Sequence, residues 1–212
     1  MPGIDHFFVF LTAGLLLNIS PGPDMLYVAT RSSTQGRMAG IVSSLGIGTG
    51  SLVHVTAAAL GLSALIFYST LAFDVIKWVG AGYLVFLGLK AIRSAHTGET
   101  NENDNLDHPP LSLPAIYRKG IWINLLNPKV ALFFMAFLPQ FVDPDSSHFA
   151  LNIILLGLIF NVCGTSVNII VAFFFARLGR WLARHRLFHK VKAWLSGTVY
   201  ILLGIGIAIS RR

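Results

Sequence analysis

Long stretches without a charged side chain dominate the chain. Residues 38–68 and 149–176 each run well past twenty residues without Asp, Glu, Lys or Arg. A helix needs about 20 mainly apolar residues to cross the hydrocarbon core of a bilayer, and buried helices of water-soluble proteins rarely reach that length without a charge. These two runs therefore predict membrane-spanning helices.

Four further apolar stretches complete the pattern. The first of them lacks a basic segment before it and continues past a proline-rich interruption, so we interpret it as a retained span rather than a cleaved signal peptide. The fold predicted is an all-α integral membrane protein with six transmembrane helices. The six predicted spans are residues 6–30, 38–68, 71–92, 116–142, 149–176 and 193–210.

Composition agrees with a membrane protein and excludes other classes. Of the 212 residues only 12% are charged, whereas a water-soluble domain carries about 25%. The single cysteine, Cys163, excludes an intramolecular disulfide and a zinc site built from cysteine pairs. The sequence contains no G-x-x-x-x-G-K-[ST] phosphate loop and no H-E-x-x-H motif, so it predicts neither an enzyme nor a cofactor or resident metal.

The basic residues are distributed unevenly between the predicted loops. Twelve of the sixteen lie beside three loops on one side of the membrane, and the loop at residues 143–147 on the other side has none. The positive-inside rule places the basic loops in the cytoplasm and both termini outside. The net charge of +7 is thus assigned to membrane topology and not to nucleic acid. The twelve are Arg31, Arg37, Lys90, Arg93, Arg118, Lys119, Arg177, Arg180, Arg184, Arg186, Lys190 and Lys192.

A polar linker divides the spans into two sets of three. Residues 94–115 are rich in Asn, Asp, Glu and Pro and suit a cytoplasmic tether between a first unit, residues 1–93, and a second, residues 116–212. Because three is an odd number, the second unit enters the membrane in the opposite sense. The chain therefore predicts two inverted-topology three-helix repeats, which secondary transporters use to build a substrate site between their halves.

Each unit begins with a span that proline interrupts. Proline lacks a backbone donor and leaves nearby carbonyl groups unpaired, and the half-helix after it exposes N–H groups that attract a carboxylate. A single break would indicate a simple kink, but two matched breaks, each followed by a charge, favour a binding site. The candidate residues at the breaks are Ser20, Pro21, Gly22, Pro23, Asp24, Asn124, Asn127, Pro128 and Lys129.

Asp24 and Lys129 are the full charges that this pattern places well inside the hydrocarbon. Each costs about 2.5–3.5 kcal/mol at mid-membrane, so we expect both to face a cavity, a partner or each other. Two interpretations stay open. The pair could be a structural link between the units, or a clamp in which Asp24 holds a substrate ammonium and Lys129 a carboxylate. Asp24 is also the candidate for proton coupling.

Polar residues in other spans are further candidates. His54 could relay protons, because histidine titrates near neutral pH, or it could make a neutral contact between helices. Asn161 and Asn168 share a helix face, for which helix packing is the first interpretation and pore lining the second. The Gly46-xxx-Gly50 pattern predicts close helix packing.

Taken together, these motifs resemble the LysE/RhtB family of bacterial amino-acid exporters, over essentially the whole chain. The resemblance implies a multi-pass exporter in the bacterial inner membrane, driven by the proton gradient, whose partners are an amino acid, protons and the lipid bilayer. It rests on the runs Ser20-Pro21-Gly22-Pro23-Asp24, Gly80-Ala81-Gly82-Tyr83-Leu84, Asn127-Pro128-Lys129 and Phe137-Leu138-Pro139-Gln140-Phe141.

The number of buried charges favours one class of substrate and weighs against the competing functions. One buried acid and one buried base favour a neutral amino acid or a derivative such as threonine or homoserine. The alternative is a cation or metal exporter on a related six-helix plan, although hard cations prefer several oxygen ligands. A membrane enzyme would need a catalytic constellation, and the sequence shows none. A homodimer is an open alternative for so small a carrier.

Overall fold

The computed structural model describes residues 6–62 and 110–182, with scattered positions between residues 75 and 93 and between residues 194 and 208. Every secondary-structure element in this described part is a helix, which confirms the all-α class there. The elements are α1 (Phe7–Ile19), α2 (Pro23–Gln35), α3 (Arg37–Ala57), the π-helical turn η1 (Ala58–Leu62), α6 (Leu113–Leu125), α7 (Pro128–Leu132), the π-helical turn η3 (Phe133–Phe137), the 3-10 turn η4 (Leu138–Phe141) and α8 (Phe149–Leu182).

Part of the predicted topology lies outside the described residues. This applies to residues 94–109 of the linker, to residues 63–68 of the second predicted span, to almost half of the predicted span 71–92 and to most of the predicted span 193–210. The division into two units and the six-helix inverted repeat therefore stay predictions.

Two to four helices of the described part are long and apolar enough to cross a membrane. Arg37–Gly61 and Phe149–Arg177 qualify as single helices. The other two candidates are bent pairs, α1 with α2 and α6 with the helical run Pro128–Phe141, and each is bent by 48° at its break. The broken spans thus occur where the prolines predict them, and the two bends have the same size.

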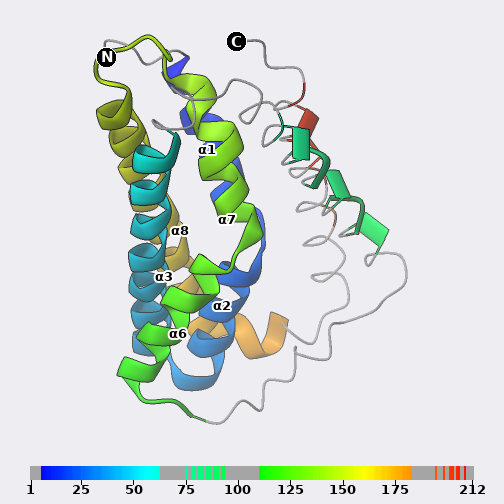
Figure 1. Cartoon of the computed structure of the whole chain (residues 1–212). Helices are drawn as coiled ribbons and strands as arrows, with labels where there is room; N and C mark the ends of the chain where they lie inside the picture. The colour runs from blue at the N-terminus through cyan, green and yellow to red at the C-terminus, as the bar shows by residue number, and fades with distance from the viewer. Residues whose placement is uncertain are drawn as a thin grey trace.

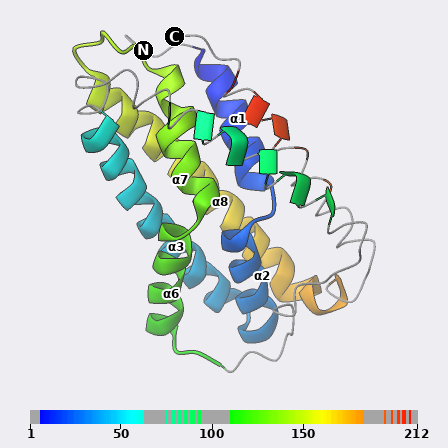
Figure 2. The ribbon, with the colours of Figure 1, turned by 45° about the vertical axis from the view of Figure 1, so that its right-hand side comes forward.

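The helices form an elongated bundle in which α3 and α6 lie side by side (Figures 1 and 2). Glycines allow this close approach, as the Gly46-xxx-Gly50 pattern predicts. A Cβ atom added at Gly50 would lie 2.8 Å from the Ile121 carbonyl oxygen, and one at Gly46 would collide with the Tyr117 carbonyl. The α3–α6 interface is therefore a contact of backbone against backbone.

Aromatic side chains pack the other half of the bundle. The rings of Phe133 and Phe160 stack with centroids 4.0 Å apart, and Phe10 packs beside them. This cluster joins α1, η3 and α8. On the outer face of α8, Val162 and Ile170 are 64% and 67% exposed. Large apolar side chains exposed in this way suit a surface that faces lipid.

The exposed charges separate between the ends of the bundle. Arg37, Arg118 and Arg177 are exposed towards the end where α2 and α8 finish and where α3 and α6 begin. The loop 143–147, which contains two aspartates, lies at the opposite end, where α8 begins (Figure 1). This separation has the sense that the positive-inside pattern predicts.

Candidate functional site

The first break leaves the Leu17 carbonyl without its helical donor, because Pro21, four residues later, has no N–H. The Ser20 N–H turns back to this carbonyl at 3.2 Å. Lys129, which comes from the second break, donates from Nζ to the same carbonyl at 3.1 Å and to the Ser20 carbonyl at 2.9 Å. Its positive charge therefore caps the C-terminal end of α1, where the helix dipole is negative.

The second break repeats this arrangement. Pro128 deprives the Asn124 carbonyl of its donor, and the Asn127 N–H turns back to that carbonyl at 3.0 Å. His54 Nε2 lies 3.1 Å from the same oxygen, and since a carbonyl only accepts, the imidazole donates. The ring of His54 also stacks on Phe134. The carbonyls freed by Pro21 and Pro128 are thus each capped by a side chain from the other half of the chain.

The connection before α2 brings Asp24 to the second break. Gly22 has an extended backbone and Pro23 begins α2, so Asp24 lies in the first turn of that helix, where the dipole favours a carboxylate. Asn124 donates from Nδ2 to Asp24 Oδ2 at 2.7 Å. A single hydrogen bond between side chains therefore joins the start of α2 to the end of α6.

Asp24 and Lys129 are both buried, with 9% and 6% of their surfaces exposed. Their charges interact. Asn127 caps the Lys129 N–H through Oδ1 at 3.0 Å. The structure therefore brings the acid and the base together at the two breaks, in a geometry compatible with either interpretation that the sequence left open.

Several buried polar atoms at the breaks have no hydrogen-bond partner among the described residues. The amide orientations are fixed, because Asn124 uses Nδ2 on Asp24 and Asn127 uses Oδ1 on the Lys129 N–H. Asn127 lies near enough to the carboxyl group to interact with it without forming a hydrogen bond. Leaving a buried polar atom unpaired costs about 1–3 kcal/mol, so these atoms are suited to a polar ligand. They are Ser20 Oγ, Asp24 Oδ1, Asn124 Oδ1 and Asn127 Nδ2.

Asn161 has other contacts. Its Oδ1 accepts a long, 3.4 Å hydrogen bond from Thr165 on the same helix and faces Gly48 of α3. These contacts support the packing interpretation, and its role in substrate binding stays a prediction.

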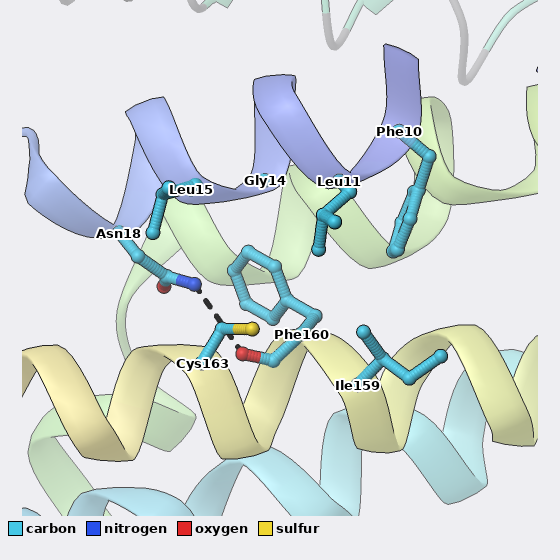
Figure 3. A pocket seen from close by; sticks show the side chains of 8 residues that line it. All are labelled: Phe10, Leu11, Gly14, Leu15, Asn18, Ile159, Phe160 and Cys163. Atoms are coloured by element: carbon cyan, nitrogen blue, oxygen red, sulfur yellow. Dashed lines mark hydrogen bonds between the residues drawn. The ribbon is translucent and has the colours of Figure 1, made fainter. Parts of the chain in front are cut away.

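A separate pocket lies between α1 and α8 (Figure 3). It is too narrow to hold a water molecule and is lined mostly by apolar side chains, including Phe10, Leu15 and Ile159. The Asn18 amide in its wall donates to the Phe160 carbonyl at 3.3 Å. Because this lining offers no charged group to a zwitterion, the breaks are the better candidate site.

The sequence analysis missed a polar stripe on α2, formed by Tyr27, Arg31 and Gln35. Arg31 was expected in a loop after the first span, but α2 continues to Gln35 and leaves Arg31 only 3% exposed. The Tyr27 hydroxyl donates to the Ile116 carbonyl at 3.0 Å, and the Gln35 side chain bonds Leu111. Polar side chains four residues apart share a helix face, and this spacing was the signal available in the sequence.

These features define a multi-pass helical membrane protein with two broken helices around a buried acid and a buried base. The family model of the LysE type translocators matches residues 15–211, and the chain belongs to this family. The resemblance that the motifs indicated is therefore confirmed. Membership of a translocator family favours the interpretation of the protein as a transporter over that as an enzyme.

Relatives from three bacteria align over most of the chain. An uncharacterized membrane protein of Vibrio cholerae is 28% identical over 98% of both chains. The homoserine/homoserine lactone efflux protein of Salmonella typhimurium is 29% identical over 91% of this chain and 85% of its own. An uncharacterized membrane protein of Pseudomonas aeruginosa is 27% identical over 98% of this chain and 96% of its own. No solved structure matches the chain.

Proposed function

We propose that the protein exports neutral amino acids or close derivatives across the bacterial inner membrane in exchange for protons, with both termini in the periplasm. The translocator family and the Salmonella efflux relative support the direction and the substrate class. The observation that carries the proposal is the buried Asp24 carboxyl group, whose Oδ1 has no hydrogen-bond partner in the described part of the chain and lies among other unpaired polar atoms at two broken helices.

The unpaired atoms match the two ends of a zwitterion. Asp24 Oδ1 and Asn124 Oδ1 accept hydrogen bonds from the substrate ammonium, and Asn127 Nδ2 and the Ser20 hydroxyl donate to the carboxylate. Lys129 has two carbonyl acceptors, so here it supplies a fixed positive charge and holds the first break. The Asp24–Lys129 pair has no net charge, and a neutral substrate adds none to the buried site.

Exchange follows from competition for one carboxylate. A substrate ammonium arriving from the cytoplasm and a proton arriving from the periplasm both bind Asp24, so the site carries one or the other. A carrier that reorients with either ligand bound to Asp24, but not with the site empty, couples amino-acid export to proton entry.

Inverted membrane vesicles, whose cytoplasmic face is outward, test this mechanism directly. Vesicles containing the wild-type protein should accumulate radiolabelled threonine or homoserine when their interior is acidic, and an uncoupler should abolish the accumulation. Asp24→Asn should remove the proton-driven part, whereas Asp145→Asn, in an exposed loop, should not. Wild-type proton dependence in Asp24→Asn would exclude Asp24 from coupling.

The same vesicles separate the cation-exporter alternative. Among the residues that the structure describes, no three His, Cys, Asp or Glu side chains gather into a group that could hold a metal ion. No observation there favours metal transport. Movement of metal cations without amino-acid flux would nevertheless replace the proposal.

A further inference from the structure

The polar stripe of α2 lies outside the proposed substrate site. We propose that Tyr27, Arg31 and Gln35 form a cytoplasmic gate over the seam between α2 and α6, along which the substrate reaches Asp24. In this gate Arg31 exchanges its Gln35 acceptor for the carboxylate of the incoming amino acid. The direction of movement rests on the proposed function, and the gating motion can be measured separately.

The stripe leads from the substrate site to the basic end of the bundle. Asp24 and Tyr27, three residues apart, share a face of α2, and both contact α6, Asp24 through the Asn124 side chain and Tyr27 through the Ile116 carbonyl. Gln35 ends α2 at the basic end seen in Figure 1. Hydrogen bonds thus follow the seam from the buried carboxylate to the predicted cytoplasmic surface.

The outermost contact can open by one side-chain movement. Gln35 Nε2 donates to the Leu111 carbonyl at 2.8 Å, and its Oε1 accepts from the Leu111 N–H at 3.1 Å. Both bonds belong to one flexible amide, so a single rotation breaks them together. The α3–α6 interface, by contrast, is closed by glycine against backbone and opens only if whole helices separate. The α2–α6 seam is therefore the side on which a gate is feasible.

Arg31 links the gate to the substrate carboxylate. Its NH1 donates to Gln35 Oε1 at 2.9 Å, and its guanidinium lies 5.7 Å from the centre of the Tyr27 ring. A carboxylate binds guanidinium through two parallel hydrogen bonds and more strongly than a neutral amide does. An amino acid that enters the seam therefore displaces Gln35 from Arg31, and the Gln35 amide loses the contact that keeps it from rotating away from Leu111.

A reversible cross-link distinguishes a gate from a structural tie. In a Cys163→Ala background, Gln35→Cys and Leu111→Cys are bridged with a short bifunctional methanethiosulfonate, and amino-acid uptake is measured in inverted vesicles. Bridging should reduce uptake to below about a tenth, as expected when the mobile element is fixed, and a reductant should restore it. The single-cysteine variants treated with the same reagent are the controls. Uptake at the unbridged rate in the bridged protein would overturn the gate.

A labelling experiment measures opening without transport. Ser43, which is buried near the Tyr27 hydroxyl, is replaced by cysteine in the Cys163→Ala background and treated with a membrane-impermeant maleimide from the cytoplasmic side. Adding Gln35→Ala should accelerate labelling about tenfold, the change expected from losing the two hydrogen bonds to Leu111 that close the seam. Thr34→Ala should not, because within the described residues the Thr34 hydroxyl bonds its own helix, at the Thr30 carbonyl. Equal labelling rates in folded Gln35→Ala and Thr34→Ala proteins would refute the gate, even if the vesicle assay confirms export. Accelerated labelling of Gln35→Ala without any amino-acid flux would refute the export proposal and leave the gate standing.

Discussion

Lys129 connects the two breaks, and its replacement by methionine tests that connection most sharply. Methionine keeps an unbranched side chain and removes the charge. Lys129→Met abolishes the hydrogen bonds from Nζ to the Leu17 and Ser20 carbonyls, which are 3.1 and 2.9 Å long. It also leaves the buried Asp24 carboxylate without its neighbouring cation.

The expected loss of stability is large. A hydrogen bond from a charged donor contributes about 1.5–3 kcal/mol, and removing one partner of a buried ion pair costs about 3–5 kcal/mol. Because one ammonium makes all these interactions, the two figures overlap and do not add. With a shift of about 2–4 °C per kcal/mol for a chain of this length, the melting temperature should fall by roughly 10 °C.

The double variant Asp24→Asn/Lys129→Met isolates the electrostatic part. A neutral carboxamide needs no cation, so the double variant should be more stable than Lys129→Met alone by at least about 1 kcal/mol, within the range of coupling between residues in contact. Thermal unfolding of the purified protein in detergent is measured for Asp24→Asn, for Lys129→Met and for the double variant. Lys119→Met, at an exposed position of α6, is the control for a lost surface charge.

Additivity would refute this reasoning. If the double variant is destabilised by the sum of the two single effects, Asp24 and Lys129 are not coupled. A wild-type melting temperature for Lys129→Met would further show that the α1 carbonyls do not need their cap.

Two other predictions concern the packing and the second break. Gly46→Ala should destabilise the protein by about 1–3 kcal/mol, the usual cost of overpacking, because the added Cβ would collide with the Tyr117 carbonyl. Gly61→Ala should not, because a Cβ at that position meets open space. Equal melting temperatures for the two variants would contradict the close α3–α6 interface. His54→Gln should retain uptake with an unchanged pH profile, because Gln can also donate to the Asn124 carbonyl. His54→Leu should lower uptake several-fold, because that carbonyl keeps the Asn127 N–H but loses its second donor. A shifted pH profile for His54→Gln in inverted vesicles would support a proton relay instead.

The positions of the breaks could be predicted because proline acts locally. Pro21 and Pro128 each remove a donor from the carbonyl four residues earlier, whatever the rest of the chain does, and the helices end where this rule places their ends. The small residues at Gly46 and Gly50 similarly indicate close packing from their size alone.

The partners of the freed carbonyls could not be predicted in the same way. Lys129 reaches Leu17 across more than a hundred residues of sequence, and His54 reaches Asn124 through the α3–α6 contact. Both contacts depend on tertiary packing, which no local pattern encodes. The sequence therefore indicated the polar residues at the breaks but not that Lys129 and His54 are helix caps.

Arg31 shows why the end of the first span could not be predicted from hydropathy. The charge of Arg31 predicts that the span ends at residue 30, but α2 continues to Gln35. Gln35 and Tyr27 lie one turn to either side of Arg31 and contact its guanidinium. Long basic side chains can be accommodated in this way when a polar neighbour receives the charge.

Substrate-dependent stabilisation tests the central claim that the two breaks enclose the substrate site. The melting temperature of the purified protein is measured with and without the amino acid that the wild type exports, since a ligand that binds only the folded state raises it. The wild type and Asp145→Asn should be stabilised, and Asp24→Asn should not. Equal stabilisation of Asp24→Asn would place the substrate elsewhere in the molecule.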